Sequence, residues 1–307
     1  MMQRCGYKLW AALILSVAAS VVYMSALMAA EDEKHKPFTL ALKTSGEVVA
    51  VAMEVKQKLA AAGFDVVGEY FPYANKTAVI IVVTSDALKK AAAKTEFGGY
   101  GAAQRVSVTK VNDEIQVAYA NPLYWSAAYR MQVDLSALSE KLANTLGKVA
   151  DFGSEEGLSA KVLAKYQYMF GMEYFDDPSE LAEFSSYQEA VNAVESGLAA
   201  ARGGVTKVYR IDIPGKEQTV FGVAINNAVE CSGDAFIMNN IDFKPLRSTV
   251  HLPYEILVSD DEVYALYARF RIAISFPDLS MIGANSFMSI MCAPSAIEGA
   301  LEAVVKK

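Results

Sequence analysis

The 307-residue chain contains only two histidines, and their surroundings limit the catalytic chemistry that its sequence can support. His35 lies in a charged segment, and His251 lies two residues before Pro253. A Ser–His–Asp triad would need one of these two imidazoles. The sequence patterns CxxC, HExxH, GxGxxG, GxSxG and the Walker lysine loop do not occur. The sequence therefore favours a protein that is not an enzyme, leaves an enzyme of unusual type open, and predicts neither a cofactor nor a metal site.

Two arginines are the strongest candidates for ligand binding. Arg269 and Arg271 alternate with apolar residues in the segment Val263 to Phe276, which is predicted to be one long strand. Residues two apart on a strand point to the same face, so the pair would form a clamp for an anion. The predicted ligand-binding surface is Arg269, Arg271, Asn285 and Phe287. The alternative is a solvated sheet face whose arginines pair with acidic side chains.

Sulfur-containing residues gather in the second half of the chain. Met281, Met288 and Met291 lie close together, and thioether sulfur is a soft ligand suited to Cu(I). Methionine also fills irregular cores, which is the more common role. Cys231 and Cys292 either form a disulfide in an oxidising compartment or are two small buried side chains.

The N-terminal segment and the net charge indicate where the protein acts. Residues 1–30 combine Arg4 and Lys8 with an apolar run and end in Ala29-Ala30, which is typical of a signal peptide. An uncleaved segment would instead anchor the chain to the inner membrane through residues 9–30, the only membrane contact predicted. The protein is thus expected to be periplasmic or extracellular. Its net charge of −7 disfavours nucleic acid as a partner, since phosphate binding needs clustered Lys and Arg.

One order of elements is predicted twice along the chain. Thr44-x-x-Glu47 and Ser186-x-x-Glu189 are capping-box patterns, each at the start of an amphipathic helix. The predicted organisation is a first domain at 38–146, a connector at 147–179 and a second domain at 180–307. The fold class is α+β, with two tandem β-α-β-β-α-β-β-α units built on mostly antiparallel sheet.

Several runs resemble a known family. Gly46 to Tyr70 and Arg105 to Pro122 are similar to the DUF302 domain, a small bacterial and archaeal domain of unknown function. The run His251 to Pro277 resembles it more loosely. The resemblance implies TBP-like units, each a curved antiparallel sheet with helices on one face. Because members of that family are thought to pair, it also implies an internal pseudo-dimer, possible within a single monomeric chain. The segment Leu279 to Cys292 has no counterpart in the first half.

These observations predict an exported binding protein that holds a small amphipathic or anionic ligand, or an envelope protein, on its sheet surface. Two alternatives stay open: a structural or assembly protein of the cell envelope, and a copper-associated periplasmic protein. The sequence does not identify the ligand.

Overall fold

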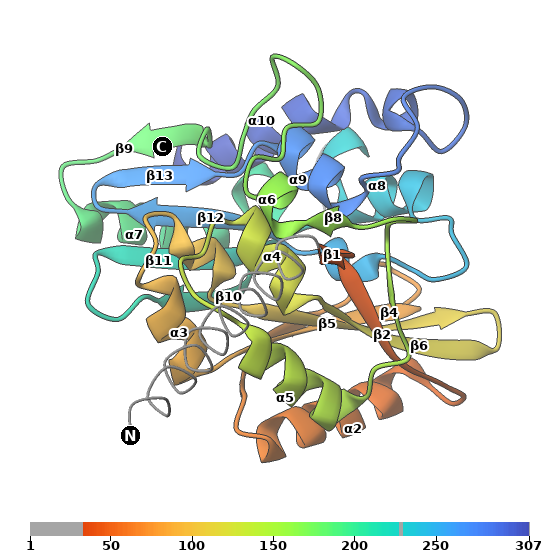
Figure 1. Cartoon of the computed structure of the whole chain (residues 1–307). Helices are drawn as coiled ribbons and strands as arrows, with labels where there is room; N and C mark the ends of the chain where they lie inside the picture. The colour runs from red at the N-terminus through yellow and green to blue at the C-terminus, as the bar shows by residue number, and fades with distance from the viewer. Residues whose placement is uncertain (1–32, 227–229, 307) are drawn as a thin grey trace, which may run out of the picture.

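The structure is a computed structural model of the chain, and it describes residues 33–226 and 230–306 (Figure 1). The predicted signal peptide or anchor at residues 1–30 lies outside the described residues. Among the described residues, one helical stretch, Phe287–Val305, is long and apolar enough to cross a membrane by length and composition. Its helix α10 (Ala293–Val305) turns a row of apolar side chains into the core, as the helix of a globular domain also does.

The first half forms a six-stranded antiparallel sheet of order β3-β4-β5-β6-β2-β7. Its elements are β2 (Phe38–Thr44), α2 (Val48–Ala61), β3 (Asp65–Tyr70), β4 (Ala78–Thr84), α3 (Asp86–Ala92), η1 (Gly98–Gly101), β5 (Gln104–Val111), β6 (Glu114–Ala120), α4 (Pro122–Ala128), α5 (Ser136–Leu146) and β7 (Ala150–Phe152). The predicted connector therefore contributes one edge strand, β7. It also holds β8 (Leu158–Ser159), paired with β1 (Lys34–His35), and α6 (Ala160–Leu163).

The second half forms a five-stranded antiparallel sheet of order β10-β11-β12-β13-β9. Its elements are β9 (Ser179–Glu183), α7 (Tyr187–Ala199), η2 (Arg202–Gly204), β10 (Val205–Asp212), β11 (Gln218–Ile225), η3 (Glu230–Ser232), α8 (Asp234–Ile241), η4 (Thr249–His251), β12 (Tyr254–Ser259), β13 (Glu262–Ala265), α9 (Ala268–Ser275), η5 (Phe287–Ile290) and α10. In each sheet the first strand of the half, β2 or β9, pairs with the last strand of the closing hairpin, β6 or β13. Apart from β7, the two sheets share one strand order.

Local sequence signals account for several element boundaries. The Ser186 side chain accepts a hydrogen bond from the Glu189 backbone at 3.3 Å, which confirms the predicted cap of α7. The predicted cap of the first helix is wrong, because Thr44 ends β2 and Glu47 is the N-cap of α2 without a side-chain bond. Asn112 takes a positive φ of 56°, the conformation that a tight β5–β6 hairpin requires, as predicted.

The predicted strand from Val263 to Phe276 is also wrong. Strand β13 ends at Ala265, and Ala268–Ser275 is helix α9. Nearly every residue of α9 is buried, so the helix lacks the apolar stripe that marks a half-exposed helix in a sequence. Alternating Phe270, Ile272 and Ile274 then imitate the period of a strand.

The two halves pack against each other through one face of each sheet. Helices α2 and α5 cover the other face of the six-stranded sheet, at the bottom of Figure 1, and enclose a core with Ile81, Val106 and Val117. The opposite face, with Ile80 and Val82, joins a larger core that runs into the second half. Strands β4 and β11 are buried along their whole length, so the centre of neither sheet presents an open face to a ligand.

Candidate functional site

The structure separates the two predicted clamp arginines. Both lie on helix α9 rather than on a strand, so their guanidinium groups do not share a sheet face. Arg269 lies at the surface and forms an ion pair with Glu173. Arg271 is fully buried and points into the molecule. The expectation of an anion clamp therefore rested on a strand that the chain does not form.

The other two predicted site residues have structural neighbours of their own. The Asn285 side-chain amide donates to the backbone carbonyl of Asn240 at 2.6 Å. The ring of Phe287 lies 4.7 Å, centre to centre, from the ring of Tyr168. These contacts hold the segment after α9 onto α8 and onto the connector, and they do not join Asn285 and Phe287 to the arginines in one surface.

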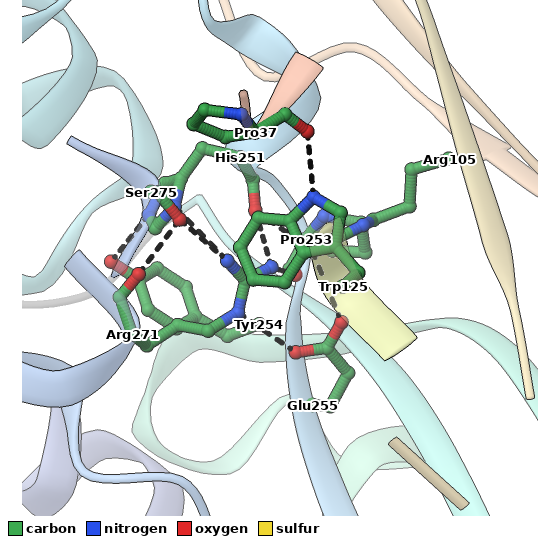
Figure 2. A network of polar contacts seen from close by, with 9 residues as sticks. All are labelled: Pro37, Arg105, Trp125, His251, Pro253, Tyr254, Glu255, Arg271 and Ser275. Carbon is green, nitrogen blue, oxygen red and sulfur yellow. Dashed lines mark hydrogen bonds and ion pairs between the residues drawn. The ribbon is translucent and has the colours of Figure 1, made fainter. Parts of the chain in front are cut away.

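Arg271 belongs to a cluster that we call the buried arginine centre: Arg105, Trp125, His251, Glu255 and Arg271 (Figure 2). Two guanidinium groups lie over the indole ring of Trp125. That of Arg105 is 4.9 Å from the ring centre, and that of Arg271 is 5.0 Å from it. Both guanidinium groups lie 3.4 Å from the Glu255 carboxylate, and both donate to the backbone carbonyl of His251. Because Arg105 lies on β5 and Glu255 on β12, the centre ties the two sheets together.

The His251 ring in this centre is not positioned for catalysis. Its Nδ1 lies 2.8 Å from the hydroxyl of Ser275, and its Nε2 lies 3.1 Å from the hydroxyl of Tyr254. Ser275 donates its own proton to the carbonyl of Arg271, and the Arg271 guanidinium, which can only donate, lies 3.3 Å from the same Nδ1. Burial, assisted by the charge of Arg105, lowers the pKa of His251 to about 3 and keeps it neutral. Since His251 and Ser275 have almost no exposed surface, a substrate cannot reach them.

The surface feature best suited to hold a ligand lies between helices α3 and α5. We call it the lysine-rimmed groove, with an apolar floor of Leu88, Ala91, Leu135 and Leu138 and a rim of Lys90, Lys94 and Lys141. Its volume is about 570 Å³, within the usual range of small-molecule sites. The floor residues form an apolar cluster separate from the two main cores. Leu88, Ala91 and Leu135 are themselves buried, with 2%, 9% and 7% of their surface accessible, and Leu138 is half-buried, so the floor is the outer edge of this small cluster.

The charge of the groove is positive in a protein that is acidic as a whole. Among the residues that the structure describes, no carboxylate lies within ion-pair distance of Lys90, Lys94 or Lys141. The one acidic residue of the lining, Asp134, accepts hydrogen bonds from the backbone and hydroxyl of Ser136, and these bonds lower its pKa. The ammonium group of Lys141 lies over the ring of Phe64, 4.3 Å from its centre, and the one carboxylate of the lining is already engaged.

Two further hollows lie elsewhere on the described part of the molecule. An open cleft of about 630 Å³ between the halves is lined by Tyr73, Lys110, Asp242 and Arg247 among others. Burial raises the pKa of Asp242 to about 7, against the hydrogen bond from the Ser248 backbone and the charge of Arg247. A smaller pocket of about 150 Å³ includes Asn285. Neither of these hollows combines an apolar floor with a rim of lysines, as the lysine-rimmed groove does. Within residues 33–226 and 230–306, no group of three or more His, Cys, Asp or Glu is arranged to hold a metal ion.

Comparisons with known proteins give no assignment. No protein-family model matches the chain, and searches of curated proteins and of solved structures find no match. The resemblance to the DUF302 domain therefore stays a prediction.

Sequence reasoning did not find the groove, although part of its signal is visible. Lys90 and Lys94 are four residues apart in the sequence, Lys90 on α3 and Lys94 in the turn that follows its C-cap, Ala93. Lys141 and Leu135 come from a helix that begins more than forty residues later, and only the packing of α5 beside α3 brings them together.

Proposed function

We propose that this chain is an exported, non-enzymatic binding protein that holds a small anionic amphiphile, such as a fatty acid, in the lysine-rimmed groove. The observation that carries the proposal is the apolar floor of Leu88, Ala91 and Leu135 beside three lysine side chains that have no carboxylate partner among the described residues. An alkyl tail on such a floor gains about 0.8 kcal/mol for each buried CH₂ group. Its carboxylate gains up to about 1 kcal/mol from each exposed lysine that it reaches.

A disulfide bond supports export. Cys231 and Cys292 form a disulfide with their Cα atoms 5.8 Å apart. Disulfides persist in oxidising compartments and are rare in the cytosol. Together with the signal-peptide pattern of residues 1–30, the bond favours the periplasm or the extracellular space. The alternative of an envelope assembly protein, anchored by an uncleaved N-terminus, would be decided by sequencing the N-terminus of the mature protein.

We further propose that the two halves are TBP-like units of an internal pseudo-dimer. Their common strand order supports this, as does the packing of one sheet face against the other through Arg105 and Glu255. In this arrangement the sheet faces hold the halves together. The ligand would bind between helices of the first unit and not on a sheet face.

Isothermal titration of the purified protein with decanoate, decanol and decyltrimethylammonium tests the groove. We expect binding of decanoate, weaker binding of the alcohol, and none of the cation. Lengthening the carboxylate by one CH₂ should tighten binding until the floor is filled, by up to about fourfold.

Charge reversal in the rim gives the matched comparison. Lys90→Glu with Lys94→Glu should weaken decanoate binding about tenfold, because two attractive charges become repulsive. The control is Lys161→Glu with Lys165→Glu, which changes the net charge equally at exposed positions outside the groove. Equal affinities for the two double variants would refute the groove as the site.

A further inference from the structure

Three methionines of the second half are exposed. Met281, Met288 and Met291 have 42%, 54% and 70% of their surface accessible, whereas Met238 has 1%. Filling an irregular core explains Met238. It does not explain three thioether side chains that lie at the surface of one short segment.

The backbone brings these three residues to one place. The amide of Met288 donates to the carbonyl of Met281 at 3.2 Å, and the preceding residue, Phe287, donates to Ser280 at 2.9 Å. Met281 therefore lies beside Met288. Residues 287–290 form the 3₁₀ helix η5, in which side chains three positions apart eclipse one another, so Met291 lies on the same side as Met288. The segment is the loop between α9 and α10 in Figure 1.

One of the three sulfur atoms has a fixed orientation. The hydroxyl of Tyr168 donates to the Sδ atom of Met281, and the Tyr168 ring packs on Phe287. A thioether sulfur has two lone pairs, so this bond leaves the second one free for a metal. A hydrogen bond of this kind orients a ligand in the way that outer-shell partners do in known metal sites.

Neighbouring groups favour a soft monovalent ion. The nearest thiols in the sequence, Cys231 and Cys292, are consumed in the disulfide, so thiolate ligands are absent from this segment. Thioethers are neutral and soft, and they select Cu(I) over the harder divalent metals. Ag(I) shares this preference as a soft ion of the same charge.

We propose that Met281, Met288 and Met291 form a binding site for one Cu(I) or Ag(I) ion. The site lies in the second half, on other elements than the lysine-rimmed groove, and does not depend on the function proposed for that groove. Because thioethers carry no proton in the neutral range, the affinity should not change between pH 5 and pH 8, unlike that of Cys or His sites.

The test uses the purified full-length protein with Cys5→Ser, so that the N-terminal thiol cannot compete. Methionine methyl groups are labelled with carbon-13 and followed by NMR while Ag(I) is added. We expect one equivalent to shift the methyl signals of Met281, Met288 and Met291 and to leave that of Met53, an equally exposed methionine on α2, unchanged. Anaerobic competition with a chromogenic chelator then measures Cu(I) affinity.

Leucine substitutions separate sulfur chemistry from apolar surface. The triple variant Met281→Leu, Met288→Leu, Met291→Leu keeps the apolar area but has no ligand atoms, and it should lose stoichiometric binding. Tyr168→Phe should weaken binding about tenfold, in the range of outer-shell changes. The control Met53→Leu should bind as the parent protein does. Unchanged binding by the triple variant, or no binding by the parent protein, would overturn the proposal.

Discussion

Asp234 allows the sharpest test of the packing between the two halves. Its carboxyl group is completely buried at the start of α8, and its Oδ2 accepts hydrogen bonds from the Tyr70 hydroxyl at 3.1 Å and the Ile225 amide at 3.2 Å. Tyr70 belongs to the first half, so the contact crosses the junction. Burial raises the pKa of Asp234 to about 7, although both hydrogen bonds act in the opposite direction.

The raised pKa fixes the sign of a pH effect on stability. The folded protein binds the Asp234 proton more tightly than the unfolded chain, whose ordinary value is 3.8. The contribution is therefore fully present below about pH 4 and is lost as the pH rises to about 7. The difference between the folded and unfolded pKa values corresponds to about 4 kcal/mol in the free energy of unfolding. Where the loss is steepest, this free energy falls by about 1.4 kcal/mol per pH unit.

Asp234→Asn isolates this contribution, because the amide oxygen still accepts a hydrogen bond but the side chain no longer titrates. Urea unfolding of both proteins between pH 4 and pH 8 should show that the parent protein loses stability relative to the variant as the pH rises. Asp242 and Glu255, whose pKa values burial also raises to about 7, contribute equally to both and cancel in the difference. Asp113→Asn, at an exposed hairpin tip, is the control. If the unfolding free energies of the parent protein and Asp234→Asn change in parallel with pH, the raised pKa of the buried Asp234 carboxyl is refuted.

Two further predictions concern other parts of the fold. Arg271→Met removes one cation of the buried arginine centre and leaves its partners unsatisfied, so urea unfolding should show a loss of about 3–5 kcal/mol. Arg269→Met, on the exposed side of the same helix, should cost less than about 1 kcal/mol, and equal losses would contradict the assigned roles. Reducing the bond between Cys231 and Cys292, which are 61 residues apart, should lower the unfolding free energy by up to about 4 kcal/mol. The protein with both cysteines replaced by serine should not respond to reductant, and a response would assign the effect elsewhere.

Signals contained within a few neighbouring residues were sufficient to predict much of the fold. The cap at Ser186, the hairpin at Asn112 and the order of helices and strands depend on local hydrogen bonds and local periodicity. The class predicted from them, α+β with antiparallel sheets, is the one that the structure has. The segment 263–276 failed the same reasoning because its helix α9, buried at every position except Arg269, carries no helical period.

The site residues were harder to predict because their roles depend on distant partners. Arg271 was expected at a surface, and it is buried because Glu255, Trp125 and the carbonyl of His251 surround it. No residue pattern within the segment 263–276 predicts those contacts. The lysine-rimmed groove is likewise a product of two helices separated in sequence, and only the packed fold places Lys94 and Lys141 on one rim.

A crystal structure of the protein with a bromine-labelled decanoate tests the proposed function most directly, because anomalous scattering locates the tail without bias. The account predicts a bromine peak between α3 and α5 over Leu88 and Leu135, with the carboxylate beside the lysine rim. A peak on another face of the molecule, or a groove that stays empty at saturating ligand, would contradict it.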